Sequence, residues 1–568
     1  MPSIQTPPVS LAAKRPPGTI SRPSVIFLTV LGMLAVMAVT SVPATAQATT
    51  ILVTTSADNN DVDEDCTEGS DNCTLREAVN VAESGDTIEF ADGIDPQLVA
   101  SLGQILIAEK DVVIVGNLDG SGPGTTISGG GEYDDRLFET SDISGLTLSN
   151  VTLTGGNADG DGGAIANRGT LTANNVHLHG NSAERGGAIH NQDGSVTITD
   201  GAVYDNEAQF GGGLGNVDGE VTIADTQFGR AGQGNTASTT GGGLHNLSGS
   251  DGLARVTIVR STFLENVAGN SGGAIMNDSV DQQGQDFVSD SEITIRDSIF
   301  QGNQAGLGGA ILNFLDGSSL DIAGSTFVGN EASLHGGALF NARGDIEAAN
   351  STFSANTAVD EGGAIMNNGA DESRLVLTHV TIVGNTAAVG GGLFQEGAFT
   401  DFFGNRVVGE GNSTLTHSIL ADNAGGDCDG SESDLTGDVR ITSTGHNLDS
   451  DESCNQLDSD VTATDVMLGD LADNGGSTMT HLPLEGSPAI EGGLNPTCLL
   501  DVDQRGEPRP GANSGACDIG AVEVQIADEP DDEPDDEPED EDTPELEPAE
   551  PVEAQPAVPV EAQPDFTG

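Results

Sequence analysis

Aromatic residues and basic residues are both scarce in this chain. It has no Trp and 2 Tyr, and aromatic residues make up 3% of its 568 positions. An ordinary α/β enzyme domain with a dense aromatic core is therefore not expected. Only 18 Lys and Arg face 90 Asp and Glu, which gives a formal net charge of −72. This balance excludes a basic nucleic-acid surface, and it repels anionic lipids and polyuronates.

Long apolar runs are also rare. One runs from Val25 to about Val42, after Lys14, Arg15 and Arg22, and the small residues Ala44-Thr45-Ala46 follow it. This order of features predicts a cleaved signal peptide over residues 1–46 and an extracellular or cell-surface location. An uncleaved N-terminal membrane anchor is the alternative. After cleavage we expect no integral membrane segment.

The chain has 6 Cys, and they occur close together in pairs. An even number of paired Cys in an exported chain predicts disulfide bonds. The alternative is six reduced thiols in the core. None of the six lies in the repeat described below, which favours disulfides, and the expected pairs are Cys66/Cys73, Cys428/Cys454 and Cys498/Cys517.

Glycine, in contrast, is abundant at 79 residues, and much of it belongs to an internal repeat. Gly-Gly followed by Ala or Gly and then Ile or Leu recurs nine times, at spacings of 24 to 36 residues. An amide follows five residues after each start, and another Asn comes five or six residues before it. The starts are Gly162, Gly186, Gly211, Gly241, Gly272, Gly308, Gly336, Gly362 and Gly390.

Short β-branched runs with period-2 alternation lie between these motifs, as in Val256-Thr257-Ile258. Such runs mark half-buried strands. Three short strands and three turns per copy predict one coil of a three-faced parallel β-solenoid, with about ten to thirteen coils in total. Like residues of adjacent coils then lie about 4.8 Å apart, so Phe263, Phe300 and Phe327 should stack, and buried Asn amides should bond from coil to coil.

These motifs resemble the repeats of polymorphic outer-membrane proteins, which have Gly-Gly-Ala-Ile and Phe-x-x-Asn signatures. The chain also resembles bacterial surface proteins with a CSLREA motif, which reads here Cys73-Thr74-Leu75-Arg76-Glu77-Ala78, with Gly85-Asp86-Thr87-Ile88 after it. The end resembles their closing segment in Asp503-Gln504-Arg505-Gly506, Arg509-Pro510 and Cys517-Asp518-Ile519-Gly520-Ala521. The resemblance covers about residues 50–524. It implies a right-handed single-stranded parallel β-helix at or outside the cell surface, and no established catalytic residues.

The predicted organisation is therefore all-β with capped ends. After the signal peptide we expect an N-terminal cap over 47–85, in which the stretch from Leu75 to Glu83 is a candidate helix. The β-helix spans 86–425, and a Cys-containing C-terminal cap region spans 426–524. Residues 525–568 are rich in Asp, Glu and Pro, and we expect a disordered, extended acidic tail.

Several groups of polar residues are candidates for catalysis or metal binding, but each also has a purely structural explanation. Arg76 and Glu77 are interpreted as residues that fix the cap. His177, His179 and His190 are a weak candidate for a metal site. The acidic run Asp58, Asp61, Asp63, Glu64 and Asp65 could hold Ca²⁺ or be a solvated loop. The sequence assigns no catalytic, cofactor-binding or metal-binding residue.

One position of the repeat is apolar in the last five copies, and its residues form a column along the stack. It directly follows the Ile or Leu that recurs in every copy, and it comprises Met276, Leu312, Phe340, Met366 and Phe394. If the Ile/Leu column is internal, these side chains form an outward stripe, because alternation cannot bury both columns. The stripe is then a ligand groove or is covered by the C-terminal region. If a turn begins there, both columns are internal. Cover or internal packing is the favoured interpretation.

The favoured function is binding without catalysis, as a monomeric adhesin with a carbohydrate or cell-surface ligand. This rests on the analogy of fold and family. One alternative is a polysaccharide lyase or glycoside hydrolase of the β-helix class, with its carboxylate pair unidentified among many acids. The other is a passive structural spacer.

Overall fold

The computed structural model describes residues 48–59, 66, 70–120, 122–249, 252–279, 290–315, 317–368, 373–400, 406–408, 412–431, 440–454, 457–494, 498–511 and 515–525. They belong to one compact unit, residues 48–568. The predicted signal peptide and nearly all of the acidic tail lie outside the described residues. Within those ranges, no helix has the length and apolar character that are needed to span a bilayer.

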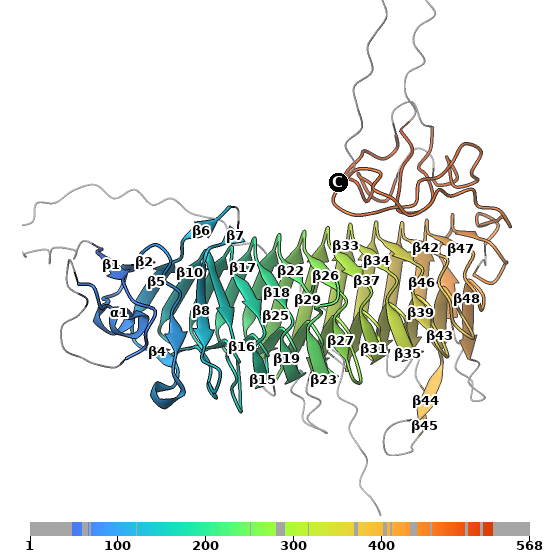
Figure 1. Ribbon diagram of the computed structural model, residues 1–568. Helices are drawn as coiled ribbons and strands as arrows, with labels where there is room; N and C mark the ends of the chain where they lie inside the picture. The colour runs from blue at the N-terminus through green and yellow to red at the C-terminus, as the bar shows by residue number, and fades with distance from the viewer. Residues whose placement is uncertain are drawn as a thin grey trace, which may run out of the picture. The chain divides into compact units, whose positions relative to one another are not determined.

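The chain winds into a parallel β-helix, which confirms the predicted fold class (Figure 1). Three long sheets run along the stack, with fourteen, fourteen and twelve strands. A fourth, seven-stranded sheet lies between the second and third sheets in chain order, and the sequence pattern did not predict it. At most twelve coils therefore have a strand in all three long sheets, which agrees with the expected number.

The first sheet contains β1 (Thr50–Val53), β2 (Thr87–Phe90), β5 (Asp111–Val115), β10 (Gly145–Ser149), β13 (Thr170–Asn174), β17 (Ser195–Thr199), β21 (Glu220–Ala224), β25 (Leu253–Val259), β29 (Asp290–Arg296), β33 (Ser318–Ala323), β37 (Asp345–Ala349), β41 (Arg374–Thr378), β46 (Asn412–Thr416) and β49 (Arg440–Ser443). The second sheet contains β3 (Gln97–Leu98), β8 (Thr125–Gly129), β11 (Val151–Thr154), β14 (His177–His179), β18 (Ala202–Tyr204), β22 (Gln227–Phe228), β26 (Thr262–Leu264), β30 (Ile299–Gln301), β34 (Thr326–Val328), β38 (Thr352–Ser354), β42 (Thr381–Val383), β47 (Ile419–Ala421), β50 (Leu448–Asp449) and β51 (Val461–Thr462).

The third sheet contains β4 (Ile105–Ile107), β9 (Phe138–Thr140), β12 (Ile165–Asn167), β16 (Ile189–Gln192), β20 (Leu214–Val217), β24 (Leu244–Ser248), β28 (Ile275–Ser279), β32 (Ile311–Phe314), β36 (Leu339–Ala342), β40 (Ile365–Asn368), β43 (Leu393–Glu396) and β48 (Cys428–Ser431). The fourth sheet contains β15 (Ser182–Arg185), β19 (Glu207–Phe210), β23 (Thr236–Thr240), β27 (Val267–Ala268), β31 (Gln304–Leu307), β35 (Glu331–His335) and β39 (Thr357–Ala358). Two antiparallel pairs branch off the coils, namely β6 (Leu118–Asp119) with β7 (Gly122–Pro123), and β44 (Ala398–Thr400) with β45 (Arg406–Val408).

The interior is built from identical side chains that stack from coil to coil, as the repeat predicts. In β17, for example, Val196 and Ile198 are buried while the residues between them are partly exposed. Five phenylalanines of the second sheet form a continuous stack with ring centroids 4.7–5.0 Å apart. Parallel in-register strands impose this spacing, so the stack fills the core without Trp.

Two columns of buried amides line the turns of the coils, as predicted. In the first, each Asn Nδ2 donates to the next Oδ1 from Asn167 to Asn367, and Gln395 ends the series, at 2.7–3.1 Å. The second runs from Asn181 to Asn423 at 2.9–3.0 Å. These bonds satisfy polar groups that are costly to bury alone.

The N-terminal coil is closed by α1 (Leu75–Val81), which lies within the stretch where a helix was expected. Thr74 and Glu77 form a capping box at its start. Arg76 is buried, pairs with Asp58 through two bonds of 2.8 Å, and donates to the carbonyls of Gly103 and Gln104. Arg76 and Glu77 therefore fix the cap, as interpreted from the sequence. Asp58 contributes to the cap through its ion pair with Arg76.

The three expected disulfides are present, namely Cys66–Cys73, Cys428–Cys454 and Cys498–Cys517. Such bonds indicate that the chain folds in an oxidising compartment. The last described segments, 457–494, 498–511 and 515–525, pack on the outer face of the second sheet. Gln504 joins Thr352 and Thr326 there, and the amide of Ala521 donates to Thr381 Oγ1.

Candidate functional site

Each Gly-Gly pair makes a sharp bend between the fourth-sheet position and the third sheet. The first Gly of all nine pairs has a left-handed φ between 58° and 69°. A Cβ on Gly308 would also lie 2.3 Å from the carbonyl oxygen of Ile311, so no side chain fits there. Glycine meets both requirements. The bend turns the outward faces of the two sheets toward each other, and a groove results.

The apolar column lies on the third-sheet side of this groove. The Ile/Leu column before it is internal, so Met276, Leu312, Phe340, Met366 and Phe394 point outward. They form an apolar cluster separate from the main core, with only 2–7% of each residue exposed. The expectation that this column is buried is confirmed, and Leu307, Phe314 and Val389 pack against it. The expected cover by the C-terminal region is wrong, because that region packs on the second sheet. The column itself faces outward and forms a cluster outside the main core. Alternation along each strand is the physical reason.

The groove contains a cavity of about 870 Å³. Its residues come from the ends of fourth-sheet strands on one side and from the outer face of the third sheet on the other. The cavity extends from the coil of Thr240 to the coil of Asn368, and the wall residues include Ser271, Leu307 and Phe314. Strands in register follow each other every 4.8 Å, so the column from Met276 to Phe394 is roughly 19 Å long. An extended ligand fits such a shape better than a compact one.

Buried polar atoms without a partner also lie in this groove. Within the described part of the chain, His190 Nδ1, Thr240 Oγ1 and His245 Nε2 are buried and have no hydrogen-bond partner. His190 Nε2 lies 3.8 Å from Asp161, and His245 Nε2 lies 3.9 Å from Asp278. Burial lowers the pKa of His190 to about 4, so its ring is neutral at pH 7. Such atoms are costly unless a ligand or water satisfies them.

Glu361 and Glu396 interact electrostatically at the C-terminal end of the groove. Burial and the nearby charge of Glu361 raise the pKa of Glu396 to about 7. Glu361 is itself held by His335, whose Nδ1 lies 2.5 Å from Glu361 Oε2. Glu396 pairs in register with Asn368, which lines the cavity. A carboxyl whose pKa lies near 7 can both give and take a proton at neutral pH, which suits general acid–base chemistry.

The histidines considered as metal ligands are not brought together. His177 and His179 lie on β14 of the second sheet, and His190 lies on β16 of the third. His179 stacks on Tyr204 at 4.9 Å, and the Arg230 guanidinium lies 3.9 Å above the same ring. No metal-binding cluster of His, Cys, Asp or Glu occurs among the described residues. Asp61, Asp63, Glu64 and Asp65 lie outside them, so the Ca²⁺ hypothesis stays a prediction.

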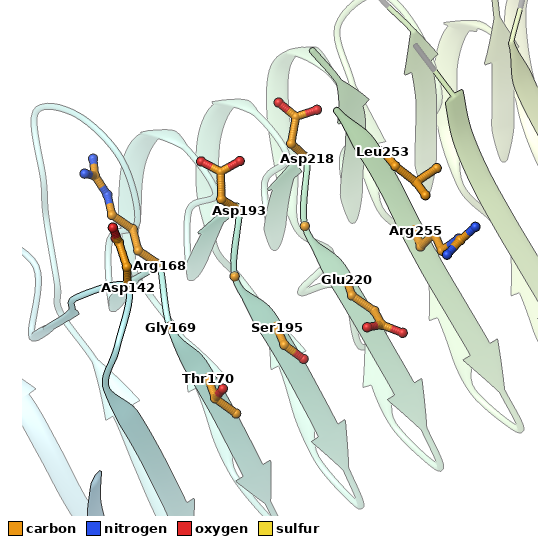
Figure 2. A pocket seen from close by; sticks show the side chains of 12 residues that line it. Asp142, Arg168, Gly169, Thr170, Asp193, Ser195, Asp218, Glu220, Leu253 and Arg255 are labelled. Atoms are coloured by element: carbon orange, nitrogen blue, oxygen red, sulfur yellow. The ribbon is translucent and has the colours of Figure 1, made fainter. Parts of the chain in front are cut away.

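A second, more polar cavity of about 420 Å³ lies at the turns between the third and first sheets. Figure 2 shows Asp193 and Asp218 on consecutive turns, and Arg168 beside Asp142. Asp142, Arg168 and Asp193 are exposed to solvent. Exposed carboxylates are already hydrated, so this cavity lacks the unsatisfied groups of the groove.

The sequence pattern drew attention to His190 but not to the other polar residues of the groove. Asp161, His335 and Glu361 each directly precede a Gly-Gly pair, and Asp278 and Glu396 lie two residues beyond the apolar column. Reading these two columns along the repeat would have found them. Their pairing across the groove depends on the bend at Gly-Gly, which the sequence pattern does not reveal.

One comparison with known proteins agrees with the repeat. A family model described as the Chlamydia polymorphic membrane protein (Chlamydia_PMP) repeat matches residues 297–313. No curated protein matches the chain. One similar structure is the "Catalytic domain of GH87 alpha-1,3-glucanase in complex with nigerose", at 11% identity and a TM-score of 0.41, covering 67% of this chain and 68% of that one. Another is the "Crystal structure of pectate lyase Pel9A", at 13% identity and a TM-score of 0.27, covering 84% and 97%.

Proposed function

We propose that this chain is an exported surface protein that binds a neutral polysaccharide along the groove. The observation that carries the proposal is an elongated cavity with an apolar floor, whose wall includes the buried, unpartnered Thr240 Oγ1. His245, with its unpartnered Nε2, lies beside this cavity, in register with Met276. Sugar rings have apolar C–H faces and a rim of hydroxyls, so they match both features. Binding sites for small molecules and chains combine the same two kinds of surface.

Charge supports a neutral ligand over an acidic one. The groove carries the carboxyl groups of Asp161, Asp278 and Glu361, and the whole chain has a formal charge of −72. Uronic acids and phosphorylated polymers are repelled by this field. Export is supported by the predicted signal peptide and by the three disulfides. Attachment to a cell or surface layer through the bound polymer then follows as the biological role.

The test is co-sedimentation of the full mature chain with a panel of insoluble neutral polysaccharides. Leu312→Glu places a charge on the groove floor, and it should weaken binding at least ~10-fold. His245→Ala, which removes an unpartnered ring nitrogen, should weaken binding without adding a charge. Leu106→Glu is the control for the added charge, because Leu106 lies in the same register column on β4 but is 53% exposed. Because Leu312 is buried, circular dichroism of Leu312→Glu checks that this variant keeps the fold.

Two outcomes would contradict the binding proposal. If no neutral polymer retains the wild-type chain, the passive-spacer alternative leads. If Leu106→Glu and Leu312→Glu bind equally well, the ligand lies elsewhere. Release of reducing ends during the incubation, lost in Glu396→Gln, would favour the second candidate, a glycoside hydrolase. The Glu361/Glu396 pair is the observation behind that candidate.

A further inference from the structure

A serine and a histidine meet where the C-terminal region docks on the second sheet. Ser354 is the last residue of β38 and points outward, because Phe353 before it is internal. Its Oγ lies 2.9 Å from His481 Nε2, and both residues are buried. On the other side of the ring, His481 Nδ1 lies 2.7 Å from the carbonyl oxygen of Gly469.

These contacts define which ring nitrogen carries the proton. A carbonyl oxygen can only accept, so Nδ1 of His481 must be the N–H donor to Gly469. Nε2 is then the acceptor, and the Ser354 hydroxyl donates to it. Burial lowers the pKa of His481, so its ring is neutral at pH 7 and Nε2 keeps its lone pair. A hydroxyl that donates to a neutral, oriented imidazole is the arrangement of an activated nucleophile.

The pair lines a cavity of about 550 Å³, distinct from the groove. Val383, Leu471 and Leu484 give this cavity an apolar wall. The backbone amides of Asp470 and Leu471, on the same wall, donate no hydrogen bond to any other described residue. Asp422 and Asp465 also line the cavity and disfavour an anionic ligand. A small neutral molecule with one polar carbonyl group matches this lining.

We propose that Ser354 and His481 form a nucleophilic dyad that hydrolyses small neutral acyl esters in this cavity. Ser354 Oγ bonds to the ester carbonyl carbon while its proton passes to His481 Nε2. The bond from that carbon to the alcohol oxygen then breaks, and Nε2 returns the proton to the departing alcohol. Water, activated by the same nitrogen, cleaves the acyl-serine to release the acid and restore the hydroxyl.

The same pair also ties the C-terminal region to the second sheet, so the test must separate the two roles. The full mature chain is treated with a fluorophosphonate probe, and the adduct is located by peptide mass spectrometry. Hydrolysis of p-nitrophenyl acetate is followed in parallel. We expect labelling at Ser354 and measurable hydrolysis in the wild type. Ser354→Ala should abolish labelling, and His481→Gln should lower both rates at least ~100-fold.

Ser487→Ala is the matched control, because Ser487 is a buried serine of the same region whose Oγ donates to Val466 rather than to a histidine. It should keep the wild-type labelling and hydrolysis rates. Wild-type protein that shows neither an adduct at Ser354 nor ester hydrolysis would overturn the proposal. Equal losses in Ser487→Ala and His481→Gln would also overturn it, since the pair would then act only as a structural tie.

Discussion

At the scale of single residues, the buried amides show how the repeat tolerates polar side chains in its interior. Asn303 Nδ2 donates to Phe263 O and to Asn330 Oδ1, at 3.0 and 2.9 Å. Its own Oδ1 accepts from the backbone and side-chain nitrogens of Asn266, both at 3.0 Å. The side chain thus connects three successive coils. It stabilises the fold because it satisfies four buried polar groups at once.

Asn303→Ala should therefore lower the free energy of unfolding by about 2–4 kcal/mol, because it leaves several buried groups without partners. Asn174→Ala is the control, since Asn174 is exposed and makes one side-chain bond to Thr199. Its loss should cost less than about 0.5 kcal/mol. Chemical denaturation followed by circular dichroism measures both values, and equal losses would contradict this account of the amide columns.

At the scale of the element, the Gly-Gly bend decides where the groove lies. Gly308 and Gly329 have nearly the same left-handed φ, 60° and 61°. They differ in their surroundings, because a Cβ on Gly308 meets the Ile311 carbonyl oxygen, while a Cβ on Gly329 meets nothing within 4 Å. Comparing the two sites separates the cost of the backbone conformation from the cost of a steric clash.

Gly329→Ala should cost about 1–2 kcal/mol, the usual cost of a side chain in this conformation. Gly308→Ala should cost clearly more, since the backbone must move to relieve the clash, and the groove wall at Leu312 should move with it. Thermal unfolding of the two variants gives the difference. Similar transition temperatures for both would mean that the bend adapts readily and does not define the groove.

At the scale of the whole molecule, the C-terminal region is anchored to the coils through buried ionisable groups. Arg509 and Glu523 form a fully buried pair at 3.0 Å. Next to them, His417 Nδ1 lies 3.2 Å from His379 Nε2, and the amide of Gly520 donates to the His417 carbonyl. Burial, the Arg509 charge and neighbouring histidines lower the pKa of both rings, to about 4 for His417 and further for His379.

A folded-state pKa below the unfolded value means that the unfolded chain binds protons more readily. The stability that neutral His379 and His417 provide is therefore complete above pH 6.5 and is lost as the pH falls, down to about 4 for His417 and to lower pH for His379. Hydrogen exchange should show protection factors within 515–525 falling over this range, while those of β13, β17 and β21 stay constant. A uniform fall along all coils would contradict this local anchoring.

Much of the fold could be predicted from the sequence because its motifs recur at regular spacing. Parallel in-register stacking places residues of one repeat position directly above each other, so columns of Phe, Ile and Asn can be read from their spacing. The Cys pairs are close in sequence and lie outside the nine Gly-Gly copies, which made their partners predictable. The fourth sheet was missed because its strands bury at most one residue each, such as Ala208 in β19 and Ala268 in β27, and therefore show no alternating apolar pattern.

The sequence by itself thus determined the coil, its core columns, the disulfide pairs and the cap around Arg76. Only the tertiary structure decided where the two candidate sites lie. Glu361 and Glu396 influence each other electrostatically from neighbouring coils, and Ser354 contacts His481, 127 residues later, because the C-terminal region folds back on the second sheet. No repeat spacing relates these partners, so their contacts depend on how non-repetitive segments and bends pack against the regular coils.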